Sequence, residues 1–231
     1  MTQRHTLVLI GCGNIFETIA FNSLTFLSNL GSSDFEDLKL IRLDSTDVAV
    51  IIANEQLALL NPATTAVFTA IDQNAMNYAR LEIYGRARIL GFKSKTLIHP
   101  SAIVAADSKV GENCWIGAGA VVSSGVKIGN NTFIGAHTRL DYGVNISANC
   151  WLGAGSSIGN HTSIGQHVVI GADINIGSAI QIGRHCSIDI PGHYLKSLAE
   201  GTFIDALFPA TAHIYTSKSS HKVFTKIEVG N

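Results

Sequence analysis

The chain has 231 residues, of which 46% are hydrophobic and 14% charged, and its formal net charge is -1. This composition excludes a disordered chain, and the balanced charge excludes a protein that is steered electrostatically to nucleic acid. No apolar run approaches the roughly 20 residues that span a bilayer, and the first residues predict a strand rather than a signal peptide. We therefore expect a soluble, cytoplasmic protein without nucleic-acid partners or membrane insertion.

Residues 1–96 predict a small α/β domain. A continuous apolar run marks the first strand, and an apolar helical pattern follows it to about Leu30. Strands then alternate with helical or apolar segments, which is the order of a doubly wound, Rossmann-like domain. The expected strands are 6–10, 37–43 and 66–71, with an apolar run at 48–52 and a helix at 74–91.

The turn after the first strand has the sequence Gly11-Cys12-Gly13-Asn14. Two glycines allow a tight turn from strand to helix, and the amides of such a turn can face a phosphate. Phe16 stands where a dinucleotide fingerprint needs its third glycine. The sequence therefore leaves two interpretations open, a nucleotide site and a plain packing turn.

Residues 97–190 carry a repeat with a period of six. Stepping by six from Ile98 to Ile188 meets sixteen aliphatic residues in succession, and glycine follows ten of them. Neither a helix, with its period of 3.6, nor a lone strand, with its period of two, produces this pattern. A coil with three short flat sides does produce it, so the repeat predicts a parallel β-helix.

The corners of this coil provide an independent test. A tight corner favours residues that tolerate positive φ, such as Gly, Asn, Asp and His. Thirteen of the fourteen residues at the corner position from Asp107 to His185 are of these types, and Ala179 is the exception. Three sides of six residues make an 18-residue coil, so residues 18 apart are expected to stack at about 4.8 Å.

This stacking rule predicts where the reactive side chains lie. Cys114, Cys150 and Cys186 fall in one inward column on alternate coils, about 10 Å apart, so we expect small buried fillers and no disulfide. His167 and His185 fall in one column beneath three asparagines. Two imidazoles without a carboxylate or thiolate in register fall short of a zinc site, so no metal is expected.

An outward column of the β-helix carries large apolar side chains. An exposed apolar ladder of this size usually marks a contact surface. We therefore predict a homotrimer whose subunits pack side by side, with the ladder in or beside the interface. The residues of the ladder are Trp115, Phe133, Trp151 and Val169.

The repeats give way to a tail at residues 191–231. Pro191-Gly192 is expected to end the coil register. The tail then either caps the open end of the β-helix, as solenoids require, or crosses to a neighbouring subunit.

The junction of the two regions carries the segment His99-Pro100-Ser101-Ala102-Ile103-Val104. A short α/β domain, this His-Pro dipeptide and then hexapeptide repeats resemble the bacterial sugar acyltransferases related to sialic acid O-acetyltransferase and bacillosamine N-acetyltransferase. The resemblance covers roughly residues 5 to 188. It implies a left-handed β-helix, a trimer with active sites between subunits, and transfer of an acyl group, usually acetyl from acetyl-CoA, to an amine or hydroxyl of a nucleotide-linked sugar.

The same resemblance implies which residues bind the nucleotide sugar, since the family holds it in the N-terminal domain. Asp44 lies where relatives often carry an acidic pair for the base of the nucleotide, although Ser45 follows it. Asn74 lies near the end of the third strand, inside the matching region. The expected substrate-binding residues are Gly11, Gly13, Asn14, Asp44 and Asn74.

The chemistry asks for a base that takes the proton of the attacking group and for an amide that holds the oxyanion. The family places its base, a histidine, in an Ile-Asp-His-Asp segment that corresponds here to Leu140-Asp141-Tyr142-Gly143. Asp141 is retained, and Tyr142 stands at the base position, where a phenol suits binding or packing better than proton abstraction. The stacking rule sets His161 above Gly143, so we expect its side chain one coil away, either as a relocated base or as a corner residue that tolerates positive φ. The catalytic candidates are His161, Tyr142 and Asp141.

The acyl donor implied by the resemblance is acetyl-CoA or another acyl-CoA. A second family histidine heads a segment that corresponds to Trp151-Leu152-Gly153-Ala154-Gly155, so Gly153 and Gly155 are the expected CoA-binding residues. The Gly-x-Pro-Ala segment with which the family closes over CoA is replaced here by the tail.

Two classes of function follow. The favoured one is a cytoplasmic trimeric enzyme, a sugar N- or O-acyltransferase acting on a nucleotide-linked amino or deoxy sugar for surface polysaccharide or glycan synthesis. The alternative is a relative that kept the trimer and lost the base, and that acts as a binding or scaffold protein. A transferase with a different acyl donor lies between the two.

Overall fold

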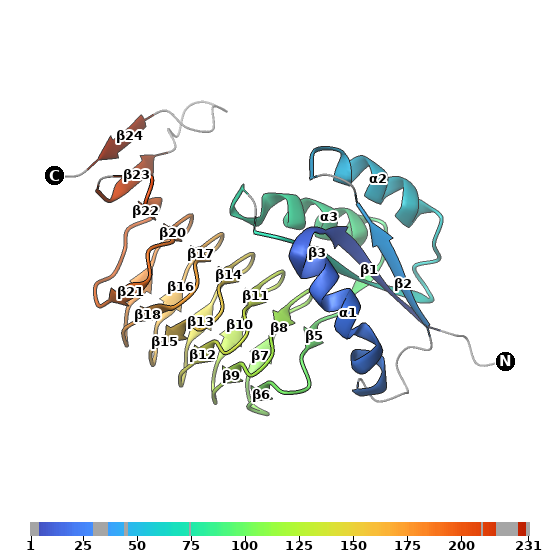
Figure 1. Ribbon diagram of the computed structural model, residues 1–231, viewed down its shortest axis with the longest axis horizontal. Helices are drawn as coiled ribbons and strands as arrows, with labels where there is room; N and C mark the ends of the chain where they lie inside the picture. The colour runs from blue at the N-terminus through green and yellow to red at the C-terminus, as the bar shows by residue number, and fades with distance from the viewer. Residues whose placement is uncertain are drawn as a thin grey trace.

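The computed structural model describes residues 5–29, 37–43, 46–73, 75–208, 210–215 and 226–229. An α/β domain comes first, and a long β-helix follows and runs away from it (Figure 1). Within these ranges, no helix has the length and apolar character needed to cross a membrane. The expected fold class, an α/β domain followed by a left-handed parallel β-helix, is confirmed.

The α/β domain is built on four parallel strands in the order β2-β1-β3-β4. Its two central strands are apolar runs buried on both faces, as a covered parallel sheet requires. Val8 and Val67 pack toward α2 and α3, whereas Leu9 and Phe68 pack toward α1 and the β-helix. The elements are β1 (Thr6–Cys12), α1 (Gly13–Asn29), β2 (Asp37–Arg42), α2 (Thr46–Ala58), β3 (Thr65–Ile71), η1 (Ala75–Asn77), α3 (Tyr78–Ile89) and β4 (Lys93–Ser94).

The β-helix has three flat sides, and on each side the strands of successive coils pair in parallel. The nine-stranded sheet contains β5 (Leu97–Ile98), β8 (Trp115–Ile116), β11 (Phe133–Ile134), β14 (Trp151–Leu152), β17 (Val169–Ile170), β20 (Ser187–Ile188), β22 (Thr202–Ile204), β23 (Ala212–Tyr215) and β24 (Lys226–Val229). The six-stranded sheet contains β6 (Ile103–Val104), β9 (Val121–Val122), β12 (Arg139–Leu140), β15 (Ser157–Ile158), β18 (Ile174–Ile176) and β21 (Gly192–Tyr194). The five-stranded sheet contains β7 (Lys109–Val110), β10 (Lys127–Ile128), β13 (Asn145–Ile146), β16 (Ser163–Ile164) and β19 (Gln181–Ile182).

The coil register predicted from the repeats is confirmed. Ile116, Ile134 and Leu152 lie directly above one another on successive coils. The aliphatic residues of the series are buried from Ile116 onward, whereas Ile98, on the open first coil, is 38% exposed. One inward aliphatic residue per side, and so three per coil, therefore builds a continuous core along the axis of the β-helix.

The cysteines fill this core as expected. Cys114, Cys150 and Cys186 are fully buried and unpaired, and each thiol donates to a backbone carbonyl of the next coil. Burial raises the pKa of Cys150 to about 12. These thiols are therefore packing groups with little thiolate character at neutral pH.

The corners also match the sequence pattern. Thirteen of the fourteen corner residues have positive φ, and Asp107 is the one that does not. Ala179, which is not of a favoured type, has a φ of 58° all the same. The corner geometry is therefore imposed by the coil, and residue type follows it.

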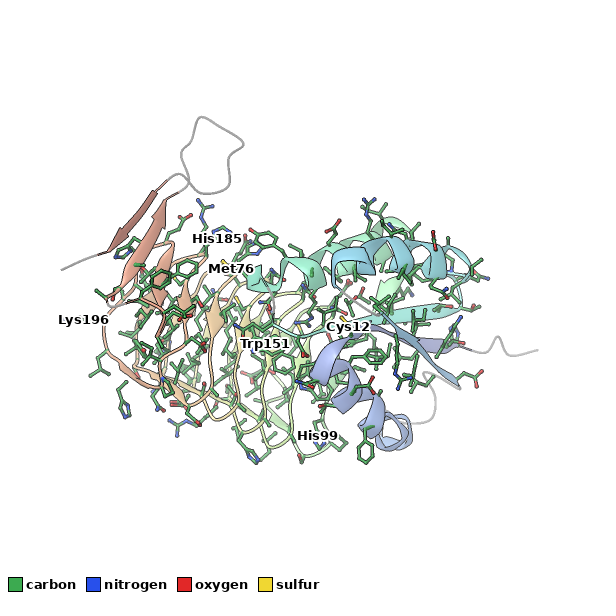
Figure 2. The ribbon with its side chains drawn as sticks, turned by 45° about the horizontal axis from the view of Figure 1, so that its top comes forward. Cys12, Met76, His99, Trp151, His185 and Lys196 are labelled. Carbon is green, nitrogen blue, oxygen red and sulfur yellow. The ribbon has the colours of Figure 1, made fainter. Side chains whose placement is uncertain are left out.

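The apolar ladder does not lie on a free surface, and this corrects the expectation that it forms a subunit interface. Trp115, Phe133, Trp151 and Val169 are at most 9% exposed and pack against β1, β3 and α1 of the same chain. The rings of Phe133 and Trp151 stack with centroids 3.8 Å apart. Trp151 lies between the α/β domain and the β-helix in Figure 2. The ladder therefore holds the chain's own domain on the outer face of the nine-stranded sheet.

Polar contacts fix the position of the docked domain. β4 pairs with β3 only at Ala66 and Val67, which leaves the next part of that strand edge without a strand partner. The Asn113 side chain of the β-helix accepts from the Thr69 N–H at 2.8 Å, and Arg80 of α3 donates to the Thr69 carbonyl and to the Asn113 carbonyl. Side chains thus complete the edge of β3, and burial lowers the pKa of the guanidinium to about 10.

The coil register does not end at Pro191-Gly192, which is a second correction. Gly192 is still paired with Ile174, its equivalent on the coil before. The coil then shortens by two residues, because Ile188 pairs with Ile204 and Ile182 bridges to Leu198. β23 joins β22 in the antiparallel sense, and β24 joins β23, so the tail extends one side of the β-helix as a hairpin.

Replacing Ala179 with glycine is expected to stabilise the protein. Left-handed backbone geometry costs an ordinary residue about 1–2 kcal/mol, part of which the greater freedom of glycine in the unfolded chain offsets. We expect the free energy of unfolding in urea to rise by about 0.5–1 kcal/mol. Ala136→Gly is the matched control, because Ala136 precedes a corner and has no positive φ; there glycine should lower the free energy of unfolding by a similar amount. Equal effects at the two positions would contradict the interpretation.

Candidate active site

The predicted catalytic residues meet at one corner of the β-helix, between the six-stranded and five-stranded sheets. The Tyr142 and His161 rings meet edge to face with centroids 5.2 Å apart, and both side chains are exposed. The His161 imidazole covers Gly143, because a Cβ built on that glycine would lie 2.7 Å from Nδ1 of the ring. His161 thus lies over Gly143 from the next coil, where the register placed it.

Backbone contacts hold this corner in place. The His161 N–H donates to the Tyr142 carbonyl at 2.9 Å, and the Tyr142 N–H donates to Oδ1 of Asn160 at 3.1 Å. Asp141 is not part of the ring pair, since its carboxylate pairs with the Arg139 guanidinium at 3.1 Å. Asp141 can therefore contribute charge to the corner, but it does not orient the His161 ring directly.

The two glycines expected to bind CoA lie elsewhere on the coil. Gly153 is buried, its N–H donates to the Ile170 carbonyl, and a Cβ there would lie 2.5 Å from the backbone of Gly171. Gly155 is exposed at the corner between the nine-stranded and six-stranded sheets, under the Asp173 carboxylate. Gly155 is the member of the pair that an external ligand can reach.

The glycine turn after β1 is occupied by a side chain of the same chain. The Asp72 carboxylate, just after β3, accepts from the Asn14 N–H at 2.8 Å and from the Ile15 N–H at 2.7 Å. Gly13 has a φ of 86° and leaves room for this carboxylate, because a Cβ there would lie 2.5 Å from Asp72 Oδ2. Gly11 lies against the Ala70 carbonyl, where a Cβ would clash. The amides that could face a phosphate at the start of α1 therefore bind an internal anion.

Within one chain, the glycine turn and the Tyr142–His161 corner lie far apart in the architecture. The turn belongs to the domain that covers the nine-stranded sheet, whereas the corner joins the other two sheets and lies opposite that face. Asp44 and Asn74, the other expected substrate-binding residues, lie outside the described residues.

A second polar cluster lies where α3 meets the β-helix. His167 and His185 stack with centroids 4.9 Å apart, as the register predicted, and Tyr78 of α3 stacks on His167 at 4.8 Å. The Tyr78 hydroxyl is 3.2 Å from Nε2 of His185. In Figure 2, His185 and Met76, from the segment just before α3, lie next to each other at this junction. The stacking of His167 on His185 follows from their separation of 18 residues. Tyr78 comes from the other domain, so no repeat in the sequence predicts its contact with them.

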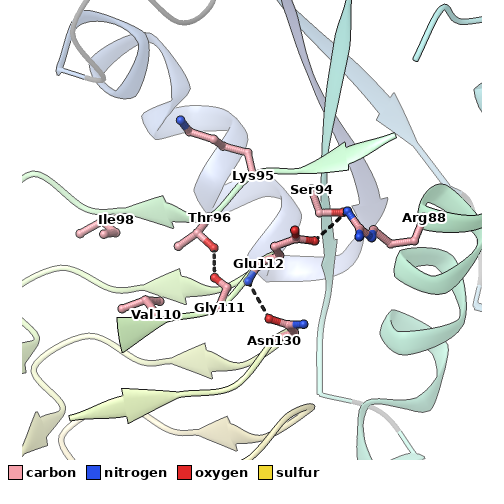
Figure 3. A pocket seen from close by; sticks show the side chains of 9 residues that line it. All are labelled: Arg88, Ser94, Lys95, Thr96, Ile98, Val110, Gly111, Glu112 and Asn130. Carbon is pink, nitrogen blue, oxygen red and sulfur yellow. Dashed lines mark hydrogen bonds and ion pairs between the residues drawn. The ribbon is translucent and has the colours of Figure 1, made fainter. Parts of the chain in front are cut away.

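A hollow of about 530 Å³ lies at the start of the β-helix, beside α3 (Figure 3). Three contacts join polar groups of its lining. Arg88 pairs with Glu112 at 3.0 Å, the Thr96 hydroxyl donates to the Gly111 carbonyl at 2.5 Å, and Asn130 accepts from the Glu112 N–H. None of the predicted catalytic residues lines this hollow. In the part of the chain that the structure describes, no group of three metal-binding side chains occurs.

Removal of the Asp72 carboxylate is expected to destabilise the α/β domain and to free an anion site. Asp72→Ala leaves the Asn14 and Ile15 amides without their acceptor, which should lower the free energy of unfolding in urea by about 1 kcal/mol. Asp72→Asn is the control, because its remaining oxygen still accepts one of the two bonds and should lose less. Inorganic phosphate should then raise the Tm of Asp72→Ala but not that of the unmodified protein. Equal stabilities of the two variants, or stabilisation of both proteins by phosphate, would contradict this interpretation.

Comparisons with known proteins bear on the repeats and on the fold. The family model for the bacterial transferase hexapeptide (six repeats) matches residues 107–142, and the model for the hexapeptide repeat of succinyl-transferase matches residues 125–160. No curated protein matches the chain in a sequence search.

Several solved structures share the architecture. PerB from Caulobacter crescentus, in complex with CoA and GDP-perosamine, is 20% identical with a TM-score of 0.65, over 86% of this chain and 92% of that one. A histidine-to-alanine variant of GDP-perosamine N-acetyl transferase from the same organism is 22% identical with a TM-score of 0.55, over 86% and 92% of the two chains. WeeI from Acinetobacter baumannii AYE is 10% identical with a TM-score of 0.50, over 87% and 97%. The chain thus carries hexapeptide repeats within residues 107–160 and shares the fold of these solved structures.

Proposed function

We propose that the protein is an acyltransferase that moves an acyl group from a CoA thioester to an amine or hydroxyl of a nucleotide-linked amino or deoxy sugar. The observation that carries the proposal is the position of His161, whose imidazole covers Gly143 beside the place of the family base. The fold supports it, since a solved structure with this architecture holds CoA and GDP-perosamine together. A cytoplasmic role in surface polysaccharide or glycan synthesis is part of the same proposal.

The chemistry needs a base on the attacking group. In the proposed step, Nδ1 or Nε2 of His161 takes the proton as the amine or hydroxyl attacks the thioester carbonyl, and the CoA thiolate leaves. The Tyr142 hydroxyl, next to the imidazole, is a hydrogen-bond donor for the substrate or for the oxyanion. Asp141 and Arg139 form an ion pair beside this step.

The donor and the acceptor are proposed to meet between subunits. The Tyr142–His161 corner and the carboxyl edge of the α/β sheet lie on opposite sides of the chain, so a homotrimer would supply the corner from one subunit and the nucleotide-binding domain from the next. The outer faces available for such packing are those of the six-stranded and five-stranded sheets, because the chain's own domain covers the third. Gly155, at an exposed corner, is the proposed contact for CoA.

One observation favours the alternative, a binding or scaffold trimer. Tyr142 occupies the place of the family base, and His161 reaches that place only from the next coil. A protein that had lost its catalytic base would keep the fold and would still bind the ligands. A measurement of turnover therefore decides between an enzyme and a scaffold. The length of the acyl chain on the donor is tested separately.

The enzymatic proposal is tested by thiol release from acetyl-CoA and longer acyl-CoAs across a panel of UDP-, GDP- and dTDP-linked amino sugars. We expect turnover with at least one pair. His161→Ala should lower kcat by about 10²- to 10⁴-fold, whereas Tyr142→Phe should retain most of it. His137→Ala is the matched control, since His137 is an exposed corner histidine with a φ of 56° on another corner. Binding of CoA without turnover would favour the scaffold, and turnover unaffected by His161→Ala would exclude the relocated base.

The assembly is tested separately by light scattering of the full chain. We expect a mass of three subunits of 24.5 kDa. One of the faces available for packing carries Lys109, Lys127 and Asn145 pointing outward. Salt screens the repulsion between such like charges, so the trimer should hold or strengthen as the salt concentration rises. A monomer at catalytic concentrations would contradict an active site shared between subunits.

A further inference from the structure

A polarised chain of side-chain amides runs along the β-helix corner that faces the α/β domain. It begins at the Thr69 N–H, which donates to Oδ1 of Asn113 at 2.8 Å. Nδ2 of Asn113 then donates to Oδ1 of Asn131 at 2.7 Å, and Nδ2 of Asn131 donates to Oδ1 of Asn149 at 2.6 Å. The three asparagines are at most 2% exposed. Because a backbone N–H can only donate, the first bond sets the direction of every later one.

The last amide in the chain sets the state of His167. Oδ1 of Asn149 is already an acceptor, so its Nδ2 carries the remaining contacts, to the Met76 carbonyl at 3.3 Å and to Nδ1 of His167 at 2.8 Å. Nδ1 of His167 must therefore accept, which places the ring proton on Nε2 and leaves the imidazole neutral. Burial, and then the neighbouring His185, lower the pKa of His167 and so act in the same direction.

The groups that face His167 complete a small hydrogen-bonding surface. The Tyr78 and His185 rings stack on it, and the Tyr78 hydroxyl contacts Nε2 of His185. On the far side of His185, the Glu200 carboxylate lies 3.9 Å from Nδ1 and is held by the Arg184 guanidinium. Tyr78 is 46% exposed and the His185 side chain 35%, so an external ligand can reach the cluster.

The position of this surface in the fold points to a ligand. It adjoins the segment between β3 and α3, at the carboxyl edge of the parallel sheet, where ligands of open α/β sheets bind. Met76 and Asn77 in that segment have φ of 55° and 65°, a pair of left-handed residues that the contacts with Asn149 hold in place. Strain of this kind is concentrated at binding sites. The neighbouring amides at the start of α1 are already taken by Asp72.

We propose that His167, held neutral by the asparagine chain, donates its Nε2–H to a neutral oxygen of the nucleotide-linked sugar, with Tyr78 and His185 alongside it. The proposal rests on the proposed function. It adds which side chain of the substrate-binding subunit contacts the nucleotide-linked sugar, and we call this contact the grip. A neutral donor favours a hydroxyl or carbonyl oxygen and gives no charge-based advantage to a phosphate. The oxygen belongs either to the sugar or to the base of the nucleotide.

The state of the imidazole is tested by ¹⁵N NMR of the full chain without ligand. We expect His167 in the Nε2–H form at neutral pH, with a pKa below the ordinary value for a histidine. Asn149→Asp replaces the donor with an acceptor, so it should move the ring proton to Nδ1 or leave the ring charged. Asn160→Asp is the matched control. The side chain of Asn160 accepts from the Tyr142 N–H, and an aspartate can still accept that bond, so the His167 ring should not change. A charged or Nδ1–H ring in the unmodified protein would overturn the proposal.

Ligand binding is tested with a variant that keeps the fold. His167→Asn extends the amide chain with a residue that the corner tolerates, so the Tm should hold while the imidazole donor is lost. We expect affinity for UDP-glucose, GDP-mannose or dTDP-glucose, whichever binds, to fall roughly tenfold, with no change for His137→Asn. Comparing each with UDP, GDP or dTDP locates the oxygen, since a loss seen only with the sugar places it on the sugar and a loss in both arms places it on the nucleoside.

The outcomes separate this proposal from the proposed function. Nucleotide-sugar binding that neither shifts the His167 resonances nor weakens in His167→Asn overturns the grip and leaves the acyltransferase proposal standing. Failure of every nucleotide sugar to bind the intact protein overturns the acyltransferase proposal, and the grip with it. Binding that depends on His167 without any turnover supports the grip and favours the scaffold.

Discussion

Closure of each coil after three short sides is the constraint from which the rest of this protein follows. The sides meet where the backbone turns through a left-handed conformation, which thirteen of the fourteen corners from Asp107 to His185 adopt. The structure keeps that conformation at Ala179, where the side chain does not favour it. Once the corners are fixed, each aliphatic residue lies above its equivalent, and parallel ladders run the length of the β-helix. The core is then one column of side chains repeated on three sides.

The same closure decides where polar chemistry can lie. A corner residue with positive φ directs its side chain back over the corner of the preceding coil: His161 covers Gly143, His137 covers Gly119, and Asp173 lies over Gly155. Where the column holds asparagines, this geometry joins them into a chain of amides. Both candidate regions, the Tyr142–His161 corner and the His167–His185 pair, are products of one geometric rule applied to different side chains.

How far the sequence could predict this structure depends on the separation of the contacting residues. Contacts between equivalent positions on successive coils follow from the 18-residue register. The cysteine column, the stacked histidines and the position of His161 could therefore all be predicted from the sequence. The burial of Trp151, the Asp72 carboxylate at the glycine turn and the Tyr78 contact depend on how two differently built regions dock, and no period encodes that. The repeat therefore predicts the correct face of the coil for the ladder but the wrong partner. The repeat does not predict the coil after Pro191, because that coil changes length.

The side chains that complete the edge of β3 also bear on how the molecule comes apart. Asn113 and Arg80 supply the bonds that another strand would supply in an isolated sheet, and the Trp115 column covers the apolar face beside them. If the two regions separated, the edge of β3 would lose its hydrogen-bond partners and the β-helix would expose the Trp115 column to water. Separation of either region therefore costs free energy. The two regions are therefore coupled into one cooperative unit, in which loosening of the first coils loosens the domain. The orientation of the carboxyl edge of the α/β sheet is in this sense a property of the whole chain and not of a hinge.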